Sequence, residues 1–147
     1  MTEIEVMLAE HACQKLQMLY GVHADRGESR AFTQLFASDG SVAVPEAPPF
    51  VGHEAIFASM EALKAQGVTM RHVMTNPVVH VVDAERARGS CYLTVYNSRG
   101  GPDAGGAWPI ALPATMGEYA DTFRRTADGW RFQSRVLTRV FRPSPQG

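Results

Sequence analysis

The sequence has little cysteine, no long hydrophobic run and no excess of charge of either sign. Its 147 residues contain two cysteines, Cys13 and Cys91, which form neither a CxxC pair nor a disulfide framework, so we expect both to be reduced. No stretch approaches the ~20 apolar residues that a membrane-spanning helix needs. The acidic start does not resemble a signal peptide, and a net charge of -1 does not indicate nucleic-acid binding. We therefore expect a cytoplasmic protein without nucleic-acid or membrane partners.

Signatures of a prepared metal, phosphate or nucleophile site are absent as well. The five histidines and two cysteines do not form a motif typical of a preformed metal cluster. The glycine pairs at 100–101 and 105–106 lack a Walker lysine and a following helix, so they do not predict a phosphate-binding loop. No G-x-S-x-G motif supports a nucleophilic serine. We expect neither a metal nor a cofactor.

What the sequence does contain is a succession of helical and extended patterns. Apolar residues recur at helical spacing over residues 3–24, and further helices are predicted around residues 31–36 and from 52 to about 67. Extended patterns predict strands at 41–44, 70–82, 87–97, 117–126 and 129–142. This order predicts one α+β domain over residues 1–142, with a curved sheet wrapped around the long first helix, and a tail at 143–147.

Two separated residues form the strongest candidate for chemistry. Asp25 follows the first helical pattern, and His72 lies near the start of the strand predicted at 70–82. A carboxylate beside an imidazole fixes the tautomer of the ring, and the ring exchanges protons near neutral pH. The pair predicts general acid–base chemistry without indicating a substrate. The ordinary alternatives are that Asp25 caps a turn and that His72 is a hydrogen-bonded core residue.

Several short segments, in this order, resemble the SnoaL-like branch of the nuclear transport factor 2-like superfamily. They are Tyr20 with Asp25 and Glu28, Phe36-Ala37-Ser38-Asp39-Gly40, Gly52-His53-Glu54-Ala55-Ile56, Arg71-His72 with Thr75-Asn76, and Asp128-Gly129-Trp130-Arg131-Phe132. The resemblance covers about residues 5–142. It implies a cone-shaped, cystatin-like α+β barrel with a curved mixed or antiparallel sheet, and an apolar pocket between sheet and helices. Membership leaves the function open, because this superfamily includes enzymes and proteins without known activity.

Within the superfamily, the resemblance points to scytalone dehydratase as a functional analogue. Its catalytic Asp falls on Asp25 and its first catalytic His on His72, whereas its second catalytic His falls on Asn97. These matches imply a small cofactor-independent lyase or isomerase, provisionally a dehydratase, for a hydrophobic cyclic or polyketide-like oxygenated molecule. In this interpretation His72 removes a proton next to a carbonyl and returns it to a leaving hydroxyl, while Asp25 orients the ring.

Other activities are compatible with the same resemblance. The alternatives are a non-catalytic small-ligand-binding or dimerisation domain, a polyketide cyclase and an epoxide hydrolase. Side chains that are candidates for orienting or covering a substrate are Tyr20, His23, Asn97, Trp108 and Tyr119. The glycine-rich segment 98–115, which also contains Ile110 and Leu112, is predicted to be a mobile lid over the pocket mouth.

Alternation along the strand patterns predicts which side chains share a face. His80 is expected on the face of His72, eight residues earlier. If Tyr119 and Asp121 face inward, Asp121 is a buried carboxylate that needs a partner, whereas Arg135 is expected to be solvated.

The outer face of the sheet is predicted to be apolar. Its expected members are the last strand together with Val79, Val81, Tyr92 and Tyr96. A broad apolar face needs a cover, so we expect a homodimer or higher homo-oligomer.

Overall fold

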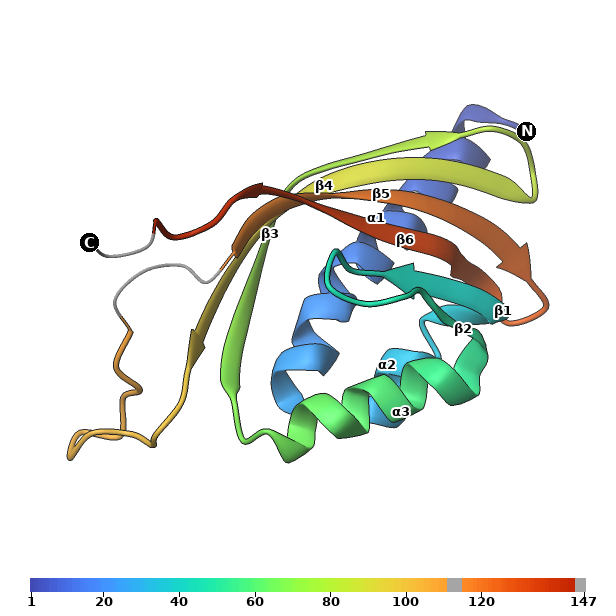
Figure 1. Ribbon diagram of the computed structural model, residues 1–147. Coiled ribbons are helices and arrows are strands. Elements are labelled where there is room, and N and C mark those ends of the chain that lie inside the picture. The colour runs from blue at the N-terminus through green and yellow to red at the C-terminus, as the bar shows by residue number, and fades with distance from the viewer. Residues whose placement is uncertain (111–114, 145–147) are drawn as a thin grey trace.

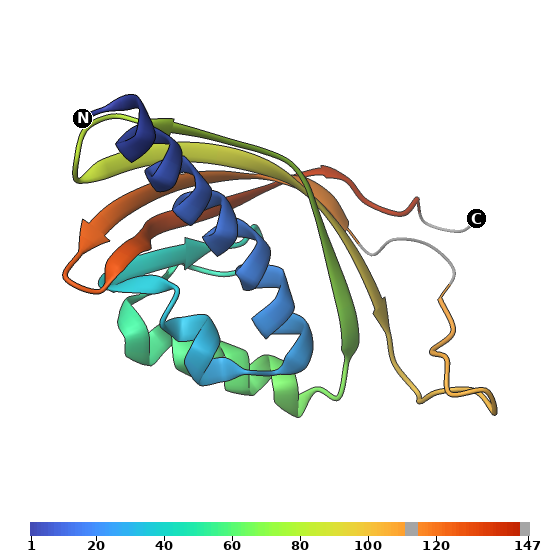
Figure 2. The ribbon, with the colours of Figure 1, turned by 180° about the vertical axis from the view of Figure 1, so that it is seen from behind.

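The fold is a strongly curved six-stranded sheet with its helices on the concave face (Figures 1 and 2). A computed structural model describes residues 1–110 and 115–144. The elements are α1 (Glu3–Arg26), α2 (Ser29–Thr33), β1 (Phe36–Ala43), β2 (Phe50–Val51), α3 (Gly52–Ala65), β3 (Thr69–Val81), β4 (Arg86–Ser98), β5 (Thr115–Thr126) and β6 (Gly129–Phe141). The strands lie in the order β2-β1-β6-β5-β4-β3, without closing into a complete barrel. The predicted α+β arrangement around a long first helix is confirmed.

The sheet is mixed because one early strand joins the end of the chain. β3, β4, β5 and β6 form consecutive antiparallel pairs, whereas β1 runs parallel to β6. β1 begins at Phe36, five residues earlier than predicted, because this side chain is buried in the core and lies opposite Phe132 of β6. The short β2 was not predicted. None of the described helices has the length and apolar character needed to cross a membrane.

The first helix begins and ends at well-defined caps. Thr2 and Glu5 form a capping box, in which the Thr2 hydroxyl accepts from the Glu5 N–H and the Glu5 carboxylate accepts from the Thr2 N–H. Gly27 ends the helix in the left-handed conformation, with φ of 65°. α1 is therefore two residues longer than predicted. Asp25 lies in its last turn and not in the turn that follows.

A β-bulge in β3 changes which side chains face the core. Thr75 pairs with Tyr92 and Val78 with Ser90, so β3 contains one more residue than β4 between these two pairs. The irregularity lies at Asn76, whose φ is 53°. One extra residue reverses the alternation for the remainder of the strand.

Three predictions about β3 are wrong for this reason. His80 does not share the face of His72, because it lies beyond the bulge and is exposed. Val79 is 5% exposed and belongs to the core, and Val81 packs against that core. Neither valine lies on the outer face of the sheet.

The segment after β4 turns away from the helices. Ser98, whose neighbours in register place it on the outer face, donates a hydrogen bond from its hydroxyl to the carbonyl of Pro109 (2.6 Å). Trp108 and Ile110 line a shallow groove that includes Tyr96. Figures 1 and 2 show residues 99–110 beyond β3 and β4, on the side opposite α1. In this conformation the segment does not cover the helical side of the sheet, and Leu112 lies outside the described residues.

Candidate functional site

Asp25 and His72 are in direct contact between the end of α1 and the start of β3. The Asp25 Oδ1 atom lies 2.6 Å from Nδ1 of the His72 ring. The carboxylate also accepts the backbone N–H of His72, at 2.9 Å for Oδ2 and 3.2 Å for Oδ1. One side chain thereby holds both the ring and the backbone of the other. The expected approach of these two residues is confirmed.

A glycine on α1 permits this contact. Gly21 lies one helical turn before Asp25, and a Cβ built on it would lie 2.9 Å from Cβ of His72 and 3.5 Å from the His72 carbonyl oxygen. A real Cβ would require a shift of the helix or the strand. The absence of a side chain at Gly21 therefore sets the distance between α1 and β3, and with it the reach of Asp25.

The hydrogen bonds define what the ring can do. A carboxylate accepts hydrogen bonds, so the short contact assigns the proton of the neutral ring to Nδ1 of His72 and leaves Nε2 with a lone pair. Both side chains are mostly enclosed, and each is 11% exposed. The pair is thus sheltered from bulk water without being sealed, as an acid–base pair requires.

A cleft of about 190 Å³ opens beside this pair. It lies between the last turn of α1, the second half of α3 and the start of β3. Its lining residues are Ala24, Asp25, Arg26, Gly27, Met60, Leu63, Lys64, Val68 and Met70. Asp25 contributes to the wall, whereas His72 lies behind it, two residues along β3 from Met70. Among the residues that the structure describes, the space beside Asp25 is this small cleft and not the larger apolar pocket that was expected.

Aromatic side chains fill much of the interior instead. Tyr20 packs edge-on against the His72 ring, with 6.2 Å between ring centroids, and against Tyr119 at 5.4 Å. The Tyr119 hydroxyl lies 3.5 Å from the Tyr20 hydroxyl, and both side chains are buried. Burial raises the pKa of both phenols above the ordinary value, so both remain neutral. Tyr20 supports the His72 ring, Tyr119 packs against Tyr20, and neither tyrosine lines the cleft.

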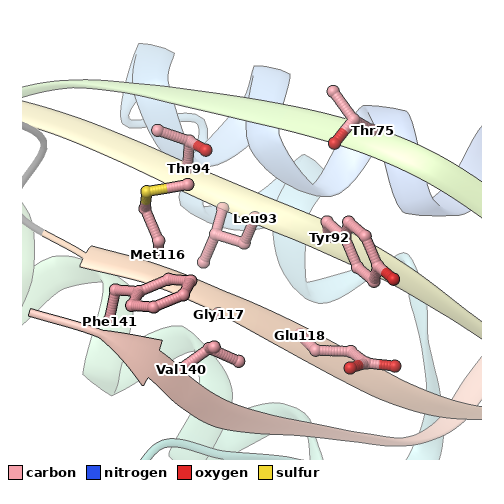
Figure 3. A pocket seen from close by; sticks show the side chains of 9 residues that line it. All are labelled: Thr75, Tyr92, Leu93, Thr94, Met116, Gly117, Glu118, Val140 and Phe141. Atoms are coloured by element: carbon pink, nitrogen blue, oxygen red, sulfur yellow. The ribbon is translucent and has the colours of Figure 1, made fainter.

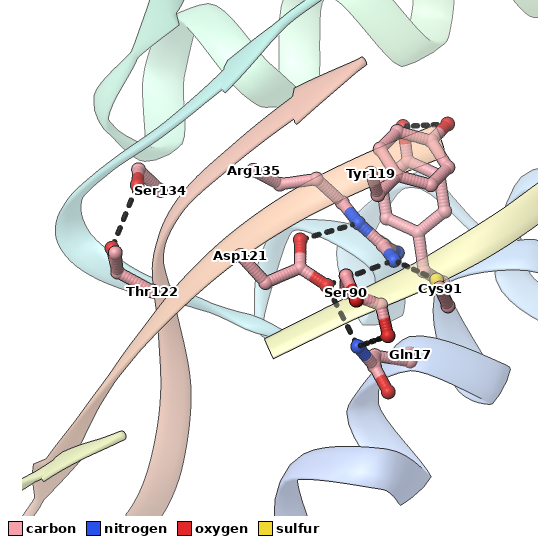
Figure 4. Close-up of polar contacts among 9 residues, drawn as sticks. Gln17, Ser90, Cys91, Tyr119, Asp121, Thr122, Ser134 and Arg135 are labelled. Carbon is pink, nitrogen blue, oxygen red and sulfur yellow. Dashed lines mark hydrogen bonds and ion pairs between the residues drawn. The ribbon is translucent and has the colours of Figure 1, made fainter. Parts of the chain in front are cut away.

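A buried ion pair lies beneath these tyrosines, and only its acidic member was expected from the sequence. Asp121 is buried as its strand alternation suggested, and Arg135 is its partner, with 2.9 Å between Nε and Oδ1 (Figure 4). Gln17 of α1 donates to the same carboxylate at 2.9 Å. The guanidinium carbon of Arg135 lies 3.8 Å from the Tyr119 ring centroid and 4.4 Å from that of Tyr20.

The expectation that Arg135 is solvated is therefore wrong. Its side chain is 0% exposed, because Asp121 on the neighbouring strand and the two aromatic rings replace water around the charge. The register pairs Asp121 directly with Arg135 across β5 and β6. The turn alone would place Asp121 opposite Ser134, and a register shift between Thr122 and Phe123 brings it opposite Arg135, so hairpin pairing read from the sequence could not have identified the pair.

The other candidate residues lie away from the cleft. His23 contacts Glu28 through Nδ1 and Oε2, 2.5 Å apart, at the partly exposed end of α1. Asn97 pairs with Met70 and therefore shares the face of His72, but its side chain is exposed. Trp108 packs on the outer side of the sheet. The described residues contain no group of three His, Cys, Asp or Glu side chains that could hold a metal ion.

Comparison with known proteins identifies the class to which this fold and site belong. The SnoaL-like domain matches residues 5–136, so the chain belongs to the SnoaL-like family. A search of curated proteins gives no match.

Solved structures agree with this assignment. An NTF2-like protein with a cystatin-like fold from Novosphingobium aromaticivorans is 26% identical, with 91% of this chain and 83% of that chain covered and a TM-score of 0.75. A protein provisionally called a scytalone dehydratase, from the same organism, is 16% identical, with 96% and 90% covered and a TM-score of 0.77. A provisionally assigned dehydratase of the NTF2-like family from Streptomyces avermitilis is 19% identical, with 86% and 92% covered and a TM-score of 0.73. The last two likenesses establish the fold alone.

Proposed function

We propose that this protein is a cofactor-independent lyase or isomerase, in the first instance a dehydratase, that uses Asp25 and His72 as an acid–base pair. The observation that carries the proposal is the 2.6 Å contact between Asp25 Oδ1 and His72 Nδ1 beside a small cleft that Asp25 helps to line. Asp25 holds both the ring and the backbone of His72, which fixes the ring in one orientation. The provisional naming of two structural neighbours as dehydratases is consistent with this assignment.

The proposed reaction removes water from a β-hydroxy ketone. Nε2 of His72 takes a proton from the carbon next to the carbonyl, and the developing imidazolium is stabilised by the Asp25 carboxylate. The C–O bond to the leaving hydroxyl breaks, and the same proton returns to that oxygen, so water leaves and a conjugated double bond forms. The Asp25 carboxylate keeps the ring in one orientation while the proton moves.

The test is the dehydration of 3-hydroxycyclohexanone, which gives an enone that absorbs ultraviolet light. We expect the wild-type protein to accelerate the reaction, and His72→Gln and Asp25→Asn to lose about 100-fold or more of that rate. His80→Gln is the matched control, because it removes a histidine of the same strand that is exposed beyond the bulge. Equal rates for His72→Gln and His80→Gln would contradict the proposal.

The second candidate function is a non-catalytic ligand-binding or dimerisation domain. The observation that favours it is an apolar groove of about 310 Å³ on the outer face of the sheet (Figure 3). Side chains that line it include Tyr92, Met116, Val140 and Phe141. A second copy of this chain is the proposed occupant, because the groove continues into further exposed apolar side chains of the same face, Val73 and Val136.

A further inference from the structure

The size and walls of the cleft beside Asp25 limit what it can hold. Its volume is about 190 Å³, and its apolar walls come from Met60 and Leu63 of α3, from Val68 and from Met70 of β3. A cavity of roughly 150 Å³ accepts benzene. One six-membered ring therefore fills this cleft, and a second fused ring would extend beyond its walls.

The charges around the cleft favour an anion. Lys64 and Arg26 both contribute to its lining, and Arg26 makes no ion pair with any residue in the described ranges. Lys64 has a weak ion-pair partner, because its Nζ lies 3.8 Å from Oε1 of Glu61. The same Glu61 oxygen accepts a 2.5 Å hydrogen bond from the Ser29 hydroxyl. The one acid in the lining, Asp25, is occupied by His72.

The position of Lys64 is set by its contact with the end of α1. A Cβ built on Gly27 would lie 3.5 Å from Cδ and 3.7 Å from Cε of Lys64, so the aliphatic part of the side chain passes over this glycine. The ammonium group stays accessible, and the Lys64 side chain is 58% exposed. An apolar stem on the wall with a charged end in water is the arrangement that holds a ligand with an apolar body and an anionic end.

From these observations we propose that the ligand of this cleft is a single-ring compound with one carboxylate substituent, the ring lying against Met60 and Met70 and the carboxylate beside Lys64. The proposal rests on the proposed function, whose substrate class it narrows from cyclic compounds in general to monocyclic acids. Lys64 is then the residue that determines specificity, while Asp25 lies in the wall beside the ring and holds His72 behind it.

Benzoate is a suitable probe because it has the ring and the charge and cannot react. The protein is labelled with ¹³C at the methionine methyl groups, and benzoate, the neutral benzamide and 2-naphthoate are titrated separately. We expect benzoate to shift the Met60 and Met70 signals in a saturable manner and to bind at least about threefold more tightly than benzamide, the size of a partly exposed charge interaction. The second ring of 2-naphthoate should bring no gain in affinity.

The decisive variant is Lys64→Met, with Lys15→Met as its matched control on an exposed position of α1. We expect Lys64→Met to abolish the preference for benzoate over benzamide, Lys64→Arg to keep it, and Lys15→Met to leave it unchanged. The same preference in Lys64→Met as in Lys15→Met overturns the proposal, as does tighter binding of 2-naphthoate. Because binding requires no reaction, benzoate binding together with an unreactive His72 would contradict the proposed function and leave this inference standing.

Discussion

Gly21 and His72 touch across the interface between α1 and β3, with no room for a Cβ on the glycine. We expect Gly21→Ala to force the helix away from the strand and to lengthen the contact between Asp25 and His72. Overpacking of this kind costs about 1–3 kcal/mol. A displacement of catalytic groups by about 1 Å can lower a rate by about 100-fold.

Two quantities are measured for Gly21→Ala: the dehydration rate and the hydrogen exchange of the His72 backbone amide. This amide donates a hydrogen bond to the Asp25 carboxylate. Both should change together: a slower reaction and faster exchange. Val22→Ala is the control, since Val22 is exposed on the same helix. Unchanged exchange at His72 in Gly21→Ala would refute the role assigned to this glycine.

The buried pair of Asp121 and Arg135 is expected to be important for stability. In Asp121→Asn the Arg135 guanidinium stays buried without its counter-charge, which costs about 3–5 kcal/mol. Asp39→Asn removes a carboxylate from the exposed pair with Arg124 and should cost less than about 1 kcal/mol. Urea unfolding measures both. Similar losses of unfolding free energy in the two variants would contradict the expectation that the buried pair of Asp121 stabilises the fold more than the exposed pair of Asp39.

The two cysteines are expected to be unreactive in the folded protein. Burial raises the pKa of the Cys13 thiol to about 12 and that of the Cys91 thiol to about 11. At pH 8 both thiols therefore keep their protons, and only the thiolate reacts with a disulfide reagent such as DTNB. We expect no rapid reaction at pH 8 and full reaction of both thiols in urea. Rapid modification of the native protein would contradict the buried placement.

The outer face of the sheet is expected to form a homodimer. Phe141→Lys places a charge in the groove of Figure 3 and should convert the dimer to a monomer, as measured by light scattering. Ile4→Lys is the control, because Ile4 is equally apolar and exposed but lies on α1. A monomeric wild-type protein at high micromolar concentration would exclude the interface.

The regular helices and strands of this fold could be predicted from local sequence patterns, whereas its irregularities could not. Apolar spacing and turn residues predicted the long helix and the four long strands to within about two residues at most ends. The bulge at Asn76 was missed, because one inserted residue leaves the apolar pattern extended while it reverses the faces of Val79 and His80. Asn76-Pro77, with no N–H on the proline, was a signal for this irregularity.

The candidate site was also predictable only in part. Asp25 and His72 could be paired from a resemblance, because their positions depend on the fold and not on fine packing. The filling of the interior depends on how Tyr20 and Tyr119 pack around Arg135, which strand periodicity cannot reveal.

The central claim is that His72, held by Asp25, removes a proton from carbon. The most direct measurement compares the dehydration rates of 3-hydroxycyclohexanone and of its C2-deuterated form in wild type, His72→Gln, Asp25→Asn and His80→Gln. The account predicts a slower reaction of the deuterated substrate in wild type and His80→Gln, with about 100-fold or greater loss of rate in the other two variants. Equal rates for the two substrates in wild type, or a wild-type rate no faster than that of His72→Gln, would contradict it.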